Sequence, residues 1–195
     1  MIIGVTGSFG AGKSFVASVL AGCGAEVIDA DKKAHELILR GSNPYRRIVA
    51  AFGEAILGAD GEIERGRLAA IAFQDKRNIK ILNGLIHPAV ISFIKKEVAR
   101  ARRERTTLVI DAPLLIEAGL HKAVDRLIVV TSTRNKQLCR GAKKFGITKK
   151  DAADRIKCQM PLSSKIKYAD YVISNDGTKS QTKKRVIALW RKGWK

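Results

Sequence analysis

The hydrophobic pattern divides the chain into two alternating kinds of segment. Short apolar runs without polar alternation, typical of strands buried on both faces of a parallel sheet, occupy residues 2–6, 26–30, 108–112, 126–131 and 171–174. Segments with a helical period occupy residues 14–21, 31–105, 135–144, 149–158 and 178–190. Strands that alternate with helices predict right-handed crossovers and a doubly wound α/β fold.

The stretch between the second and third predicted strands is far longer than one crossover helix. It contains about 75 residues, so we expect an inserted helical subdomain. Turn residues at 41–44 and 58–61 divide the insertion. His87 and Pro88 predict the first turn of a further helix, where proline is tolerated.

Composition and charge narrow the class of protein. The chain has 195 residues, of which 46% are hydrophobic, enough for a core that folds without disulfides. No apolar run is long enough to span a membrane, and the three cysteines form no CxxC pair, so we expect a reduced, cytoplasmic protein without transition-metal chemistry. The net charge of +19 predicts a phosphate-bearing or otherwise polyanionic partner.

A phosphate-binding motif follows the first predicted strand. Residues 7–14 read Gly-Ser-Phe-Gly-Ala-Gly-Lys-Ser, which fits G-x-x-x-x-G-K-[ST] and opens a helix. Glycines allow backbone N–H groups to turn towards phosphate oxygens, and the helix N-terminus adds positive potential. We expect Lys13 to contact the outer phosphates and the Ser14 hydroxyl to bind Mg²⁺. The motif predicts binding of a nucleoside triphosphate.

The motif alone does not choose among GTPases, ATPases and small-molecule kinases. A GTPase would carry N-K-x-D to bind guanine, but Leu138 stands where the aspartate is needed. The segment after the third strand, beginning at Asp111, also lacks D-x-x-G. The sequence therefore disfavours a GTPase switch.

Carboxylates follow the second and third predicted strands. Asp29 and Asp31 are two residues apart, so in an extended chain both would point the same way at the ligand-binding edge of the sheet; one of them could instead cap the next helix. Asp111 resembles a Walker B carboxylate, and Glu117 lies just beyond it. Phosphoryl transfer to an alcohol needs a carboxylate that accepts the hydroxyl proton. We expect Asp31 in that role, with Asp29 as the alternative.

With these residues in place, nearly the whole chain resembles the dephospho-coenzyme A kinase family of P-loop kinases. The resemblance rests on the phosphate loop, Asp29-Ala30-Asp31, His87-Pro88, the segment 111–117 and a distal series consisting of Gln137, Arg140, Arg155, Gln159-Met160-Pro161, Lys165, Ala169-Asp170 and Asn175. It implies ATP-dependent phosphorylation of the ribose 3′-hydroxyl of dephospho-CoA, the last step of coenzyme A synthesis. It also implies a three-layer P-loop fold with a five-stranded parallel sheet, a helical insertion and a mobile lid.

The resemblance and the motifs together define the expected site. The expected catalytic residues are Asp31, Lys13 and Arg140. The expected nucleotide-binding residues are Ser8, Phe9, Gly10, Ala11, Gly12, Lys13, Ser14, Phe15, Arg140, Lys144 and Asn175. The expected substrate-binding residues are Asp29, Asp31, His87, Asp111, Leu115 and Glu117, and the expected Mg²⁺ ligands are Ser14 and Asp111. His87 could equally be a helix cap before proline.

The lid is expected at residues 136–165. Arg140, Lys143 and Lys144 have helical i, i+3 and i+4 spacing, so their charges should converge on a triphosphate; the alternative is an exposed basic helix. A segment rich in charge and poor in apolar anchors could hinge. The sequence departs from the family at Lys144, where arginine is usual, at Gly141, which replaces a larger apolar residue, and at Phe15, which replaces a small hydroxyl residue.

These observations assign residues 1–31, 106–135 and 166–195 to a nucleotide-binding core, 32–105 to a coenzyme-binding insertion and 136–165 to the lid. The expected partners are the small molecules ATP and dephospho-CoA, with no obligatory nucleic acid and no membrane span, in a monomer or weak homo-oligomer. Two alternatives remain: a P-loop kinase of another nucleotide-like acceptor, and a nucleic-acid-binding P-loop protein suggested by the basic tail at 183–195.

Overall fold

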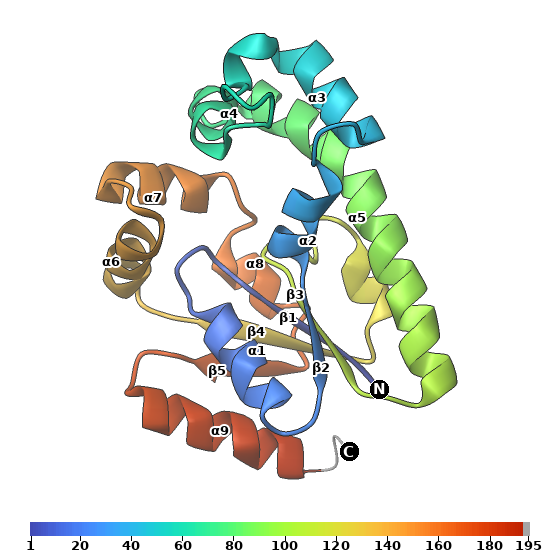
Figure 1. Ribbon diagram of the computed structural model, residues 1–195. Helices are drawn as coiled ribbons and strands as arrows, with labels where there is room; N and C mark the ends of the chain where they lie inside the picture. The colour runs from blue at the N-terminus through green and yellow to red at the C-terminus, as the bar shows by residue number, and fades with distance from the viewer. Residues whose placement is uncertain (193–195) are drawn as a thin grey trace. The chain divides into compact units, whose positions relative to one another are not determined.

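The computed structural model describes residues 1–192, apart from the side chain of Lys76, so the last three residues of the basic tail lie outside the described part. Five strands form one parallel sheet in the order β2-β3-β1-β4-β5 (Figure 1). Their bounds are β1 Ile2–Gly7, β2 Glu26–Asp29, β3 Leu108–Asp111, β4 Arg126–Thr131 and β5 Tyr171–Ser174. The predicted α/β class and five-stranded parallel sheet are confirmed.

The connections place helices on both faces of the sheet. Across the sheet, the chain steps in one direction from β1 to β2 and in the opposite direction at each later connection, from β2 to β3, β3 to β4 and β4 to β5. Because parallel crossovers are right-handed, α1 (Lys13–Ala21) lies on a different face of the sheet from the later connections. α9 (Lys179–Arg191) follows β5 and packs against α1 (Figure 1). α8 (Leu162–Ile166) packs against β4.

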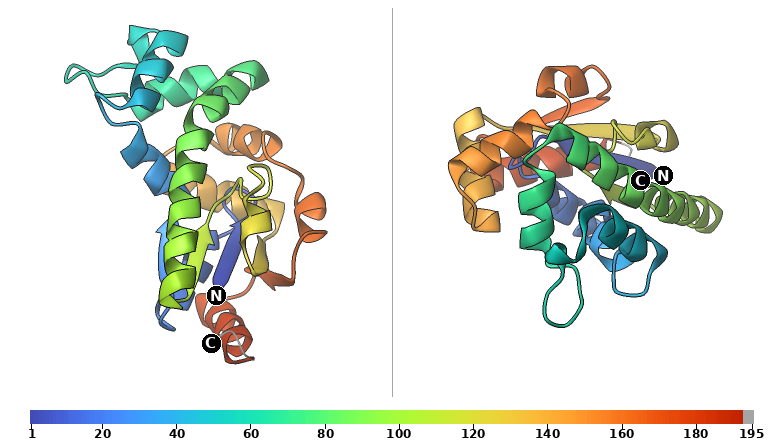
Figure 2. Two further views of the ribbon diagram at one scale, coloured as in Figure 1. Left: turned by 90° about the vertical axis from the view of Figure 1, so that its right-hand side faces the viewer. Right: turned by 90° about the horizontal axis from the view of Figure 1, so that it is seen from above.

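The segment between β4 and β5 begins with two neighbouring helices. α6 (Arg134–Phe145) and α7 (Lys149–Lys157) contact each other and lie side by side in both views of Figure 2. A capping box between Thr148 and Asp151 begins α7. The 3₁₀ helix η2 (Leu120–Ala123) lies in the connection between β3 and β4.

The core lies between the central strands and the α1–α9 layer. Ile3, Val5, Val109, Ile128 and Val130 supply fully buried side chains from the three inner strands. α1 and α9 contribute a second buried set, among them Val16, Leu20 and Val186. This packing fixes the carboxyl end of β1, where the phosphate-binding motif begins.

The edge strands depart from the predicted burial on both faces. β2 is mostly exposed, and Val27 has 38% of its surface accessible. The prediction fails here because β2 has a neighbour on one side only, whereas β1 and β3 lie inside the sheet and are buried throughout. An apolar run therefore identified the strand but not its place in the sheet.

The chain forms two compact units. One consists of residues 1–29 and 95–195, and the other of residues 30–94. The second unit contains α2 (Ala30–Leu37), α3 (Asn43–Phe52), the 3₁₀ helix η1 (Glu54–Ile56), α4 (Arg65–Ala72) and the first part of α5 (Lys76–Glu104). Its own core is formed by Ile38, Ile48, Ile56 and Leu68. The predicted boundaries of core, insertion and lid stay a prediction.

α5 corrects the prediction for His87 and Pro88. The two residues lie in the middle of this 29-residue helix rather than at the first turn of a new one. Proline removes one backbone donor and usually kinks or ends a helix. Here the helix continues through Pro88, with Leu85 and Ile86 packed on the core of the second unit, so the cap interpretation of His87 is wrong.

No helix in residues 1–192 is long and apolar enough to cross a membrane.

Candidate functional site

The phosphate-binding motif forms a loop between β1 and α1. α1 begins at Lys13 with Gly12 as its N-cap, and no side chain caps it, so its first N–H groups are oriented by the loop backbone. The Ala11 N–H donates to the Ser8 carbonyl over 3.1 Å, and Lys13 Nζ lies 3.4 Å from the same carbonyl oxygen. This geometry is that of an anion cradle at a helix N-terminus.

Three positions in the loop require glycine; at Gly7, with a φ angle of 149°, a Cβ would lie 2.3 Å from the Val130 carbonyl oxygen. Gly10 and Gly12 have φ angles of 74° and 92°, in the left-handed region that side chains avoid. A Cβ at Gly10 would lie 2.2 Å from the Gln137 carbonyl oxygen, and one at Gly12 would lie 2.1 Å from Asn175 Nδ2. The loop therefore touches both α6 and the end of β5 through its backbone.

Asn175, directly after β5, connects three parts of the site. Its Nδ2 donates to the Ala11 carbonyl over 2.9 Å, and its Oδ1 accepts from the hydroxyl of the fully buried Thr182 over 2.9 Å. Its backbone carbonyl accepts from Arg140 Nη2 over 3.0 Å. Asn175 thus links the phosphate loop to α9 and to α6, as a buried residue with each polar group paired.

Arg140 lies beside the phosphate loop, with Nη1 3.9 Å from the Cβ position of Gly12. The Arg140 guanidinium donates to Ser132 Oγ over 3.2 Å and to the Asn175 carbonyl. Lys143 and Lys144 are exposed, and Lys144 Nζ lies over the Phe145 ring at 5.2 Å. The contacts with Ser132 and Asn175 direct Arg140 towards the loop, and the convergence of all three cations on a triphosphate stays a prediction.

The side chain of Phe9 contacts the predicted lid. Its ring stacks on Phe145 with centroids 5.1 Å apart, and its N–H donates to Gln159 Oε1 over 2.8 Å. The lid therefore has an aromatic anchor, which corrects the expectation of a segment poor in apolar anchors. The sequence could not reveal it, because about 130 residues or more separate Phe9 from its partners.

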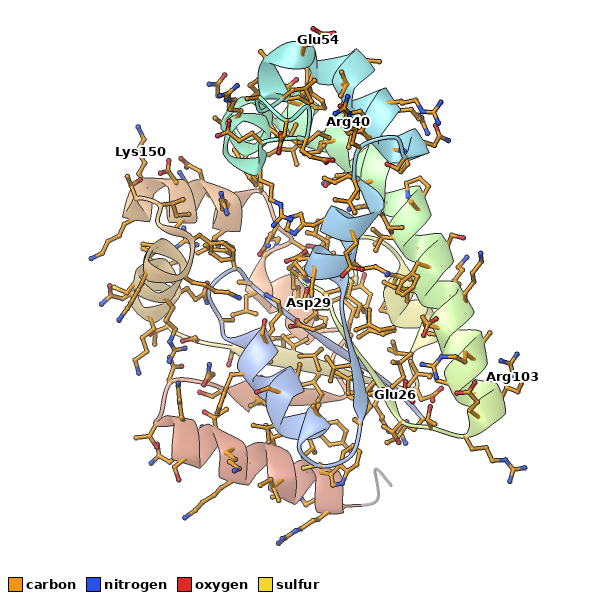
Figure 3. The ribbon with its side chains drawn as sticks, in the orientation of Figure 1. Glu26, Asp29, Arg40, Glu54, Arg103 and Lys150 are labelled. Carbon is orange, nitrogen blue, oxygen red and sulfur yellow. The ribbon has the colours of Figure 1, made fainter. Side chains whose placement is uncertain are left out.

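The carboxylates are arranged differently from the prediction. Asp29 and Asp111 end β2 and β3 and are direct register partners, so they lie together at the carboxyl edge of the sheet. Figure 3 shows Asp29 at the end of β2 opposite to Glu26. Asp31 is not in extended chain, because α2 begins at Ala30 immediately after the strand. Asp31 lies in the first turn of α2, where the helix dipole favours a negative charge.

Glu117 and Leu115 are engaged inside the protein. Glu117 Oε1 lies 3.0 Å from Nζ of the fully buried Lys165, and it also accepts from the Met160 N–H over 3.0 Å. Burial lowers the pKa of Lys165, and the neighbouring carboxylate of Glu117 opposes that shift. Leu115 is completely buried. Both residues therefore shape the segment after β3. Leu115 exposes no group through which it could make the direct substrate contact expected of it.

Three further expected residues are placed as follows. The Ser14 side chain is at the exposed start of α1. The Phe15 ring packs against the core, with Lys179 Nζ 6.0 Å from its centroid, and its N–H donates to the Gly12 carbonyl. The side chain of Phe15 thus supports the packing of α1 on α9. His87 is half-buried in α5.

Some residues that build the site were not assigned a role from the sequence. The buried Gln137 donates to the Ser132 carbonyl over 2.6 Å, and its own carbonyl faces Gly10. Thr182 fixes the Asn175 amide, and Asp176 accepts from the Thr133 N–H over 2.7 Å at the start of α6. The sequence points to Gln137, Gln159 and Lys165 only through the distal series of the family resemblance. No sequence pattern points to Thr182 or Asp176.

Comparison with known proteins identifies the family. The family model for dephospho-CoA kinase matches residues 1–181. The chain belongs to the dephospho-CoA kinase family. The dephospho-CoA kinase of Geobacillus kaustophilus is 41% identical over 97% of this chain and 94% of its own length. That of Geobacter metallireducens is also 41% identical, over 98% of this chain and 96% of its own.

Solved structures agree with this assignment. A protein from Thermus thermophilus superposes with a TM-score of 0.78 at 29% identity, covering 99% of this chain and 97% of that one. The dephospho-CoA kinase of Campylobacter jejuni shares the fold, with a TM-score of 0.71 at 24% identity and coverage of 98% and 96%. The family consists of ATP-using P-loop kinases that phosphorylate dephospho-CoA in coenzyme A biosynthesis, which confirms the predicted kinase class, ATP and Mg²⁺.

Proposed function

We propose that this chain transfers the γ-phosphoryl group of ATP to the ribose 3′-hydroxyl of dephospho-CoA, at the carboxyl edge of its sheet. The observation that carries the proposal is the phosphate loop between β1 and α1 in a chain that matches the family model over residues 1–181. The loop supplies the phosphate donor site, and the family supplies the acceptor, which the loop alone does not choose.

The donor site is proposed to consist of the loop and its supports. The backbone of residues 8–14 would surround the β- and γ-phosphates, with Lys13 as a charge on the outer oxygens. Arg140 supports the same region because its guanidinium lies 3.9 Å from the Cβ position of Gly12. Since Arg140 is already anchored on Ser132 and Asn175, it can meet developing negative charge without further ordering.

Mg²⁺ fits the oxygen groups at this edge. Ser14 carries a hydroxyl at the start of α1, and Asp111 carries a buried carboxylate at the end of β3, next to Asp29 in register. Hard oxygen ligands of this kind, together with phosphate oxygens, are those that Mg²⁺ takes in kinases. We assign Ser14 and Asp111 as its protein ligands; when bound, the ion would neutralise charge on the transferred phosphoryl group.

The acceptor side is proposed to use Asp31 as the group that orients the 3′-hydroxyl and accepts its proton. Asp31 follows β2 in the first turn of α2, two residues after Asp29, which remains the alternative. His87 is proposed to contact the acceptor from α5. Glu117 is assigned a positioning role, because its carboxylate is already paired with Lys165 and with the Met160 N–H.

The test is a coupled ADP-release assay with dephospho-CoA, nucleoside monophosphates and shikimate as separate acceptors. We expect turnover with dephospho-CoA and product analysis that places the phosphate on the 3′-oxygen. Asp31→Asn should lower kcat about 100-fold, with ATP affinity unchanged, and Asp29→Asn is the matched control with a smaller loss. The larger loss in Asp29→Asn would exchange the two roles, and preference for another acceptor would overturn the proposed substrate.

We also propose a monomer or weak homo-oligomer that acts in the cytoplasm without an obligatory nucleic acid. Sedimentation velocity over a range of protein concentrations tests the assembly state, and nuclease treatment before the assay tests independence from nucleic acid.

A further inference from the structure

The third residue of the phosphate loop is seated on the lid rather than turned into the core. Phe9 stacks on Phe145 at the end of α6, with ring planes 28° apart. The ring occupies the space beside Gly141, where a Cβ would lie 2.3 Å from Phe9 Cε1 and 2.9 Å from Cδ1. A large side chain in the loop therefore fits against α6 because residue 141 has no side chain.

The same rings hold a cation of the lid. The Arg155 guanidinium of α7 lies 5.5 Å from the centroid of Phe9 and 5.5 Å from that of Phe145. Arginine at this distance is attracted to the ring faces. Burial lowers the pKa of Arg155, and the negative charge of Asp151 opposes this effect, but arginine remains protonated at neutral pH.

A hydrogen bond fixes the backbone of the same loop residue. The Phe9 N–H donates to Gln159 Oε1 over 2.8 Å, directly after α7. Three groups of the lid, a stacked ring, a cation and an amide oxygen, thus converge on one residue of the phosphate loop.

We propose that Phe9 and Gly141 form a matched pair that docks the lid on the phosphate loop. Phe9 is then a positioning residue: its ring positions Arg155, and the docked ring also fixes the orientation of the Phe9 backbone N–H. This inference rests on the proposed function, because the loop is taken as the ATP site. The docked pair holds a cation next to the loop whose amides bind the transferred phosphates. A displaced Phe9 ring would move both Arg155 and the loop backbone, and misplacements of about 1 Å can cost a kinase about 100-fold in rate.

The discriminating variant is Gly141→Ala. Alanine favours a helix interior over glycine, so a purely structural role predicts a higher melting temperature and unchanged catalysis. The matched pair predicts instead that the added methyl displaces the Phe9 ring and undocks the lid. Gly84→Ala in α5 is the matched control, because a Cβ there meets no atom within 4 Å. It should raise the melting temperature and leave kcat unchanged.

Three readouts separate the outcomes. In Gly141→Ala we expect kcat to fall about tenfold or more, with the dissociation constant of ATP changed by less than about threefold. Adding Phe9→Leu should remove the clash, so the double variant should be no worse than Phe9→Leu alone, a non-additive result. Trypsin should cleave faster at the exposed lysines of the lid, Lys143, Lys144, Lys149 and Lys150, in Gly141→Ala than in the wild-type protein.

The outcomes also separate this inference from the proposed function. If the wild-type protein shows no ADP release with dephospho-CoA, the proposed function fails, while lid proteolysis and ATP binding still test the docking. Wild-type kcat and wild-type cleavage in Gly141→Ala, or additive losses in the double variant, would overturn the matched pair. Faster lid cleavage together with the non-additive rescue would support it.

Discussion

The phosphate loop and α6, which begins the predicted lid, lie against each other but are held by different means. The loop is fixed by backbone geometry: three glycines with positive φ, a turn from Ser8 to Ala11, and a helix without a side-chain cap. α6 is held by side chains: Arg140 donates to the Asn175 carbonyl, and Asp176, which follows β5, accepts from the N–H of Thr133 at the N-cap of the helix. The geometry of the loop is set by neighbouring residues, whereas the bonds that hold α6 to residues 175 and 176 join positions 35 and 43 residues apart.

This difference predicts which substitutions will reduce catalysis alone and which will also reduce stability. Within the loop, changing one charged side chain should remove catalysis and leave the fold intact, because the backbone forms the cradle. At α6, changing one of the side chains that bond outside the helix should alter both the geometry of the site and its stability.

The largest effect is expected at Lys13. Lys13→Ala should lower kcat about 1,000-fold or more, since it removes the only side-chain charge that the motif directs at the outer phosphates. The melting temperature should not change, because Lys13 is half-buried and fills no core space. Steady-state kinetics with calorimetry checks both statements, with the exposed Lys150→Ala of α7 (Figure 3) as the control. Activity of Lys13→Ala close to that of the control would show that the loop takes no part in the reaction.

Arg140 should rank second. Arg140→Ala is expected to reduce kcat about 100-fold while the dissociation constant of ATP changes less, because a preorganised cation acts mainly on charge that develops during transfer. Arg140→Lys should remain impaired, since lysine cannot bond Ser132 and Asn175 as a planar fork. Arg134→Ala, an exposed arginine of the same helix, should change the rate by less than about threefold. Equal rates for the two alanine variants would place Arg140 outside the site.

A stability effect is expected where α8 meets the segment after β3. Glu117→Gln should destabilise the protein by about 2 kcal/mol, because it leaves the fully buried Lys165 charge without its carboxylate. Lys165→Met removes the charge itself and should cost less. In Glu117→Gln the pKa of Lys165 loses the opposing effect of the carboxylate and falls further, so unfolding free energy should rise with pH more steeply than in wild type between neutral pH and about pH 10. Urea unfolding at two pH values measures both effects.

The smallest effect is expected at Asp176, which follows β5 and accepts a hydrogen bond from the N–H of Thr133 at the start of α6. The bond from the Thr133 N–H lowers the pKa of Asp176, assisted by the hydroxyl of Ser132. A carboxylate whose folded pKa is depressed stabilises the protein above its unfolded value and loses that effect as pH falls through the folded value. The stability difference between wild type and Asp176→Ala should therefore be constant near neutral pH and shrink below about pH 4. A difference independent of pH down to pH 2 would assign the role to packing alone.

The parts of the molecule that the sequence determined are those set by neighbouring residues. Residues 126–131 and 171–174 were predicted as strands with their observed bounds, because continuous apolar runs of that length fit buried parallel strands. The loop between β1 and α1 followed from the motif, since its glycines act through local backbone geometry. The fold class followed from the alternation of strands and helices.

Tertiary structure decided what depends on contacts between distant residues. It placed β2 at an edge, which exposed an apolar run, and it continued α5 through Pro88, against the local preference for a helix end. It started α2 directly after Asp29, so that Asp31 became helical. It also brought Phe9 to Gly141 and Glu117 to Lys165. The physical reason is that packing and burial of charge are fixed by partners that have no sequence period, so a local pattern carries no information about them.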